Sequence, residues 1–120
     1  MPRILYIEDD ENNRMLVKRI LMVEGHTVDE ADSASSGLAM ALRNPPDLIL
    51  MDLSMPGKDG LMATQEIRTH PSIAHIPIVA LTANVREEDR ERAKAAGCNG
   101  FITKPIDVDS FPEQIIEYLR

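Results

Sequence analysis

Charged and hydroxyl side chains stand directly after the apolar segments of this sequence, where those segments end. They are Glu8-Asp9-Asp10, Asp52, Thr82 and Lys104-Pro105. Carboxylates that converge on one site repel one another unless a cation lies between them. Magnesium suits that place, because it typically binds one or two carboxylates together with waters and phosphate oxygens. With a lysine and a threonine hydroxyl to meet further phosphate oxygens, the set predicts phosphoryl transfer onto a carboxylate, which depends mainly on positioning and electrostatics.

Each of these residues, taken alone, also has an ordinary structural explanation. Acidic residues stabilise the first turn of a helix, so the three acids could simply precede one. Asp52 suits a turn at the end of a strand, and Thr82 could cap the turn that follows it. A lone lysine such as Lys104 is most often a solvated surface residue. The functional interpretation therefore depends on whether one fold brings all four groups together.

The elements that must position these groups are indicated by the hydrophobic pattern. Short apolar runs predict strands near residues 4–7, 27–31, 48–51, 76–81 and 101–103. Helical spacing of apolar residues, with glycine or proline at several ends, predicts helices near residues 12–23, 35–42, 61–69, 86–96 and 110–119. Strands that alternate with helices predict an α/β doubly wound parallel sheet with both faces covered. In such sheets ligands bind beyond the carboxyl ends of the strands, which is where the four polar groups stand.

Length and composition narrow the class of protein. The 120 residues, of which 43% are hydrophobic, suit one domain over residues 1–120 with no second, output domain. A formal net charge of -7 argues against a nucleic-acid partner and against an anionic membrane surface, because both favour a basic protein. The single cysteine, Cys98, cannot form an internal disulfide, and no apolar run is long enough to span a membrane. We therefore expect a cytoplasmic protein.

The sequence resembles the receiver domains of two-component response regulators across essentially its whole length. The matching segments are Ile4-Leu5-Tyr6-Ile7-Glu8-Asp9-Asp10, Asp47-Leu48-Ile49-Leu50-Met51-Asp52-Leu53-Ser54-Met55-Pro56-Gly57, Ala80-Leu81-Thr82-Ala83 and Lys104-Pro105. Each segment alone is weakly specific, whereas their order, spacing and placement at strand ends are together highly specific. The resemblance implies a flavodoxin-like, five-stranded parallel sheet with strand order 2-1-3-4-5 and helices on both faces.

The resemblance also implies a role for each matching position. Asp52 matches the phosphoryl acceptor and a metal ligand, and Glu8 and Asp9 match the acidic pair that supports magnesium, Asp9 more directly. Asp10 falls one position beyond that pair. The remaining matches are the backbone carbonyl of Ser54 as a further metal ligand, Thr82 as the switch hydroxyl, Lys104 as the phosphate-pairing lysine, Pro105 after a cis peptide bond, and Phe101 as the switch aromatic. Phe101 lacks the hydroxyl of the tyrosine that many members have, and it could equally be an ordinary core residue of its strand.

The partners that the resemblance implies are proteins. The donor of the phosphoryl group would be a histidine kinase or a histidine phosphotransfer protein. A downstream protein target would dock on the face formed by the helix at 86–96, the strand at 101–103 and the helix at 110–119. The chain would assist its own phosphorylation and dephosphorylation without being an enzyme that turns over a free substrate. Its own histidines lie in or near loops and are expected at the surface: His26, His70 and His75.

Other functions fit the sequence less well. A phosphatase of the haloacid-dehalogenase type would need a second aspartate two residues after its nucleophile, where this sequence has Ser54. A flavodoxin-like nucleotide binder would want a Gly- or Ser/Thr-rich loop after the first strand, whereas Glu8-Asp9-Asp10-Glu11 would repel a phosphate. A receiver-like scaffold that is never phosphorylated is disfavoured by the complete acid, threonine and lysine set. The chain could also be a receiver excised from a hybrid histidine kinase.

Overall fold

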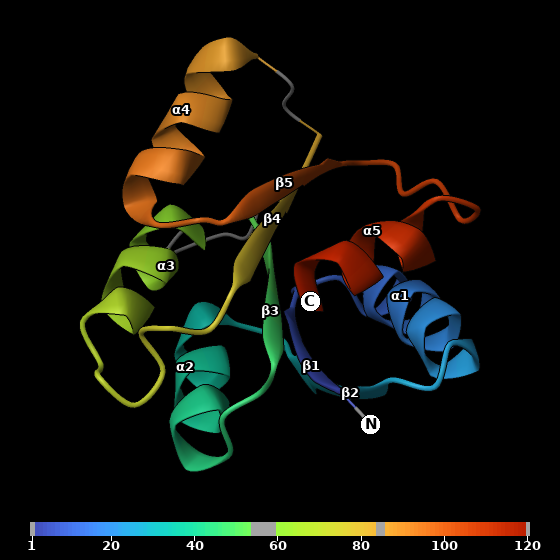
Figure 1. Cartoon of the computed structure of the whole chain (residues 1–120), viewed down its shortest axis with the longest axis horizontal. Helices are drawn as coiled ribbons and strands as arrows, with labels where there is room; N and C mark the ends of the chain where they lie inside the picture. The colour runs from blue at the N-terminus through green and yellow to red at the C-terminus, as the bar shows by residue number, and fades with distance from the viewer. Residues whose placement is uncertain (1, 54–59, 84–85, 120) are drawn as a thin grey trace.

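Within the residues that this computed structural model describes, 2–53, 60–83 and 86–119, five parallel strands alternate with five helices (Figure 1). The strands are β1 (Arg3–Ile7), β2 (Thr27–Ala31), β3 (Leu48–Asp52), β4 (Ile78–Thr82) and β5 (Gly100–Thr103). The helices are α1 (Glu11–Val23), α2 (Ala34–Arg43), α3 (Gly60–Arg68), α4 (Glu87–Ala96) and α5 (Phe111–Leu119). The strands form one sheet in the order β2-β1-β3-β4-β5, which confirms the predicted doubly wound topology.

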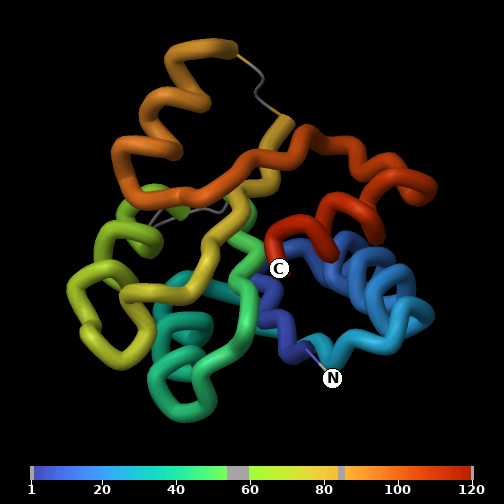
Figure 2. The backbone as a smooth tube through the Cα atoms, viewed as in Figure 1, coloured from blue at the N-terminus to red at the C-terminus, as the bar shows by residue number. Residues whose placement is uncertain are grey.

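Helices cover both faces of the sheet, with α1 and α5 on one side and α2, α3 and α4 on the other (Figures 1 and 2). Side chains alternate between these faces along each strand, so Ile4 and Tyr6 pack in the cluster with α1 and α5, while Leu5 and Ile7 pack with the other three helices. The central strands β3 and β4 are buried along their whole length. Each fully buried leucine or isoleucine contributes roughly 1.5–3 kcal/mol to the free energy of unfolding, so the sheet is a stable support for the residues at its edge.

Each described helix is too short or too polar to cross a bilayer.

The first two helices begin with side-chain caps that explain their exact starting points. The carboxylate of Asp10 accepts a hydrogen bond from the backbone N–H of Asn12 at 3.1 Å, which caps α1. Ser33 and Ser36 form a reciprocal capping box at α2, so that helix begins at Ala34, one residue earlier than the sequence predicted. Asp10 is therefore the N-cap of α1, and it is the acid that the sequence analysis left out of the pair formed by Glu8 and Asp9.

His26 is buried, so the expectation that it lies at the surface was wrong. Only 8% of the residue is exposed, and neither ring nitrogen has a hydrogen-bond partner within the described part of the chain. The chain turns through Gly25, which has a φ of +90°, and enters β2 with alternating burial. His26 and Val28 both point inward because they are two residues apart, whereas Thr27 between them is exposed.

The guanidinium of Arg68 joins the end of α3 to the segment before β4 and to the turn between α4 and β5. From the end of α3 it donates to the carbonyls of Ala74 at 3.0 Å and Ile76 at 2.7 Å, just before β4. It also donates to the carbonyl of Gly97 at 2.8 Å and to Oδ1 of Asn99 at 2.7 Å, in the turn between α4 and β5. One planar group thus satisfies several loop acceptors, which a lysine ammonium could not reach together.

Replacing Arg68 by lysine is expected to lower the free energy of unfolding by about 2 kcal/mol, because several partly buried carbonyls lose their donor. Urea denaturation followed by circular dichroism measures this loss. Arg19→Lys, on the exposed side of α1, is the matched control and should stay within about 0.5 kcal/mol of the parent. Equal stability of the two variants would mean that the Arg68 contacts do not hold these loops together.

Candidate functional site

The polar groups singled out in the sequence lie at the carboxyl ends of the strands. In the parallel register Ile7 pairs with Met51, and Asp52 pairs with Leu81. Glu8 therefore follows β1 at the level where Asp52 ends β3. β4 ends at Thr82, which pairs with Thr103 at the end of β5, and Lys104 comes next. Because all the pairings are parallel, segments about a hundred residues apart in sequence deliver their end residues to one edge of the sheet.

Three carboxylates meet at this edge. One oxygen from each of Glu8, Asp9 and Asp52 lies within 4.8 Å of the others. Glu8 and Asp52 are each only 1% exposed, whereas Asp9 is exposed. A hard divalent cation with oxygen ligands fits this donor set, since three acids at such distances need positive charge and one of them is open to solvent. Ser54, which the sequence named as a further ligand through its carbonyl, lies outside the described residues.

Lys104 supplies a positive charge between the two buried carboxylates. Its ammonium Nζ donates to Oε1 of Glu8 at 2.8 Å and to Oδ1 of Asp52 at 3.2 Å. Its backbone N–H donates to the carbonyl of Thr82 at 2.8 Å, which fixes the lysine at the end of the β4–β5 ladder. The bond from Lys104 to Pro105 is cis, as expected. One ammonium thus bridges two of the three carboxylates, and the guanidinium of Arg14 donates to the backbone carbonyl of Glu8 at 2.7 Å.

Glu8 and Lys104 stabilise each other's charge. Burial by itself raises the pKa of Glu8, but the hydrogen bond from the Lys104 ammonium and its positive charge outweigh burial and hold the pKa well below its usual value. Burial also disfavours the charged form of Lys104, yet the hydrogen bond to Glu8 and the charge of Asp52 raise the pKa of the amine above its usual value. Glu8 is therefore a carboxylate and Lys104 an ammonium at neutral pH.

Two contacts of Glu8 were not foreseen from the sequence. The phenol of Tyr6 donates to Oε1 of Glu8 at 3.1 Å, and the amide Nδ2 of Asn13, on α1, donates to the same oxygen at 3.2 Å. The signal for Tyr6 was its hydroxyl, the one polar group among the side chains of residues 4–7, two residues before Glu8 and so on the same face. Asn13 gave no signal, because its approach depends on how α1 crosses the end of β1.

Thr82 and Phe101 share a face of the sheet. Phe101 pairs with Ala80, and Thr82 pairs with Thr103, so the two side chains are diagonal neighbours on the side of α4. Thr82 is buried, and Phe101 is half-buried against the core beneath α4. Nothing in this geometry by itself assigns either of them a switching role.

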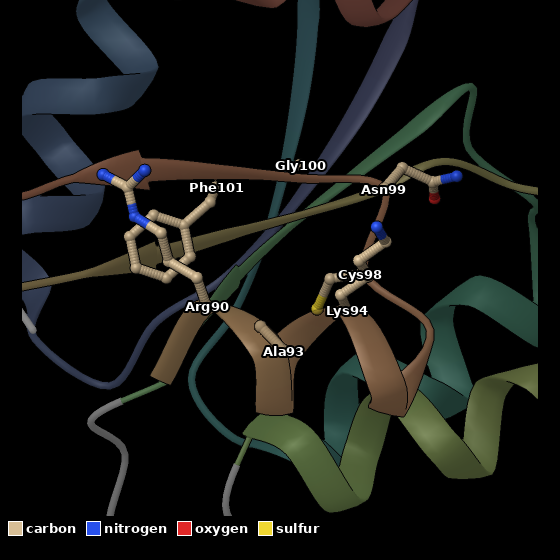
Figure 3. A pocket seen from close by; sticks show the side chains of 7 residues that line it. All are labelled: Arg90, Ala93, Lys94, Cys98, Asn99, Gly100 and Phe101. Atoms are coloured by element: carbon tan, nitrogen blue, oxygen red, sulfur yellow. The ribbon is translucent and has the colours of Figure 1, made fainter. Parts of the chain in front are cut away.

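A cavity of about 220 Å3 lies beside Phe101, between α4 and β5 (Figure 3). The guanidinium of Arg90 lies over the Phe101 ring, 5.2 Å from its centroid, which is within the range of a cation–π contact. The other lining residues are Ala93, Lys94, Cys98, Asn99 and Gly100. The aromatic side chain therefore borders free space, and the guanidinium that lies over its ring lines the same cavity.

Comparisons with known proteins agree with this geometry. The family model of the response regulator receiver domain matches residues 4–116. The chain is 35% identical over 116 residues to the polar-differentiation response regulator DivK of Brucella ovis, covering 97% of this chain and 94% of that protein. It is also 35% identical over 120 residues to the protein of the same name from Brucella anthropi, covering 99% and 98% of the two chains.

Solved structures show the same fold. The chemotaxis protein CheY4 of Vibrio cholerae superposes with a TM-score of 0.94 at 25% identity, covering 98% of both chains. The receiver domain of a sensor histidine kinase from Pseudomonas aeruginosa superposes with a TM-score of 0.90 at 32% identity, covering 98% of this chain and 97% of that one. That second structure is described as holding a magnesium ion coordinated in its active-site cleft.

Proposed function

This chain belongs to the response regulator receiver domain family, and from that membership we propose that it accepts a phosphoryl group on Asp52 in a magnesium-dependent reaction. The donor is a phosphohistidine, carried by a histidine kinase or a histidine phosphotransfer protein. The observation that supports this most directly is the Lys104 ammonium shared by Glu8 and Asp52 at the carboxyl edge of the sheet. A structural ion pair would need one buried acid, whereas this lysine serves two acids, with Asp9 beside them.

The proposed reaction is a direct transfer between the two proteins. A carboxylate oxygen of Asp52 attacks the phosphorus as the bond from phosphorus to the donor imidazole nitrogen breaks. The imidazole leaves with the electron pair of that bond and keeps or takes up a proton. Lys104 turns from the carboxylates to a phosphoryl oxygen, and Thr82 offers its hydroxyl to another. Glu8, Asp9 and Asp52 would hold a magnesium ion, which would supply the remaining positive charge.

The output we propose is a change in the face made by α4, β5 and α5. The acyl phosphate carries close to two negative charges where the Asp52 carboxylate carried one, and its oxygens draw the Thr82 hydroxyl inward. Phe101 then has room to move, since it borders both Thr82 and the cavity under Arg90. A protein target that prefers one of the two arrangements reads the signal as a population shift. A receiver cut from a hybrid kinase would use the same chemistry and differ only in its partner.

The first test is phosphorylation by a small donor. Acetyl phosphate is added to the purified chain with magnesium or with EDTA, and the protein is weighed by intact mass spectrometry. We expect a gain of one phosphoryl group that requires magnesium. A chain that binds magnesium by calorimetry but gains no mass would contradict the proposal and favour a receiver-like scaffold. Gain of the same mass in EDTA would contradict the role of the metal.

A further inference from the structure

We infer that Tyr6 and Asn13 are positioning residues, which hold the Glu8 carboxylate in place for the metal when Lys104 leaves it for the phosphoryl group. This inference rests on the proposed function and adds residues for which neither the sequence motifs nor the fold assigns a role. Three donors reach the same oxygen, Oε1 of Glu8, from three different elements: Tyr6 of β1, Asn13 of α1 and Lys104 after β5. The backbone N–H of Asp10 lies 3.4 Å from the other oxygen, Oε2.

The departure of Lys104 is what makes the other two donors necessary. Glu8 is 1% exposed, so its carboxylate depends mainly on donors from the protein. Magnesium would supply the counter-charge once Lys104 has moved, but the oxygen that Lys104 releases still needs donors to stay hydrogen-bonded. The Tyr6 hydroxyl and the Asn13 amide already donate to Oε1 of Glu8 at 3.1 and 3.2 Å, so this oxygen stays hydrogen-bonded throughout the reaction. Oε2 is then left in a fixed direction for the metal.

Tyr6 is well suited to such a role. The residue is completely buried in the cluster with α1 and α5, where a phenylalanine would fill the same space without needing a partner. A buried hydroxyl is unfavourable unless it is hydrogen-bonded, and here its bond goes to Glu8.

The space needed for Lys104 to move is next to the same three donors. A cavity of about 320 Å3 is lined by Tyr6, Asn13 and Lys104 together with Leu16, Ala83 and Pro105. The lysine side chain can therefore exchange partners without displacing the packed phenol. The cavity and the convergence on one oxygen are independent observations, and both place Tyr6 and Asn13 beside the moving group.

The test is a calorimetric titration of Tyr6→Phe with magnesium at pH 7.5, beside the parent and Tyr118→Phe. Tyr118 is the other tyrosine, packs against the same cluster from α5 and is the matched control. We expect Kd for magnesium to rise about five- to tenfold in Tyr6→Phe, the factor that corresponds to the typical net value of one hydrogen bond, and to stay unchanged in Tyr118→Phe. The rate of phosphorylation by acetyl phosphate at saturating magnesium should fall by a similar factor.

A double-mutant cycle separates positioning from general stability. In a Glu8→Gln background, Tyr6→Phe should leave Kd for magnesium unchanged, because the oxygen that Tyr6 orients no longer carries the charge. Asn13→Ala probes the same oxygen from the surface of α1, and it keeps the test decisive if Tyr6→Phe folds poorly. A change under twofold in both Kd and rate for Tyr6→Phe and Asn13→Ala, in a parent that binds magnesium and is phosphorylated, overturns the inference and leaves the proposed function standing. A parent that does neither overturns the proposed function itself.

Discussion

Asp52→Asn is expected to abolish phosphorylation and, without magnesium, to make the fold more stable. The amide lacks the nucleophilic carboxylate, so no acyl phosphate forms. In the parent, Asp52 is 1% exposed and shares one ammonium with Glu8, while Asp9 adds a third negative charge close by. Removing one of these charges relieves repulsion and desolvation, and the amide oxygen can still accept from Lys104. We expect the free energy of unfolding to rise by about 1 kcal/mol.

Two measurements on the same variant check this prediction. Intact mass after treatment with acetyl phosphate and magnesium reports the acceptor, and urea denaturation in EDTA reports stability. Asp109→Asn, an exposed carboxylate between β5 and α5, is the control and should behave as the parent in both. A phosphoryl gain that persists in Asp52→Asn would mean that another side chain is the acceptor. A loss of stability in EDTA would mean that the site is not under electrostatic strain.

The fold was predictable because the apolar runs are short, strongly hydrophobic and separated by clear helix signals. Errors were confined to element ends and have local causes. β4 begins at Ile78 and not at residue 76, because the N–H of Ile76 turns back to the carbonyl of Ile73 and Pro77 has no N–H to give. Pro77 instead contributes only its carbonyl, which accepts from Ile49. Such contacts depend on neighbours that the local sequence does not reveal.

The site was predictable for a different reason. Once the sheet is parallel, the residue after each strand must lie at one edge, so Glu8, Asp52 and Lys104 could be brought together from topology alone. Tyr6 and Asn13 could not, since a contact between side chains of different elements depends on helix crossing and rotamer. The burial of His26 was missed because its sequence neighbours resemble a loop. Its position two residues before the apolar Val28 was the signal that both side chains point to the same, buried face.

Lys104→Met is expected to slow phosphorylation by about a hundredfold while tightening magnesium binding, two effects of opposite sign from one substitution. The ammonium stabilises charge that develops on the transferred group, and removal of one such donor typically costs about 10²–10³ in rate. The same ammonium occupies Glu8 and Asp52 at 2.8 and 3.2 Å when no metal is bound. It therefore competes by charge with a cation for these carboxylates, and its removal should lower Kd for magnesium by several-fold to about tenfold.

Stability should respond to magnesium in this variant more than in the parent. Without metal, methionine leaves two buried carboxylates facing each other without the ammonium between them, which we expect to lower the free energy of unfolding by about 2 kcal/mol. Saturating magnesium binds only the folded chain and should recover most of that loss. Calorimetry gives Kd, and urea denaturation with magnesium or EDTA gives the stability difference. Lys94→Met, on exposed α4, is the control and should shift neither quantity. Slower phosphorylation together with tighter magnesium binding is expected only if Lys104 competes with the metal for the carboxylates. Weaker magnesium binding in Lys104→Met would show instead that the lysine organises the acids for the metal.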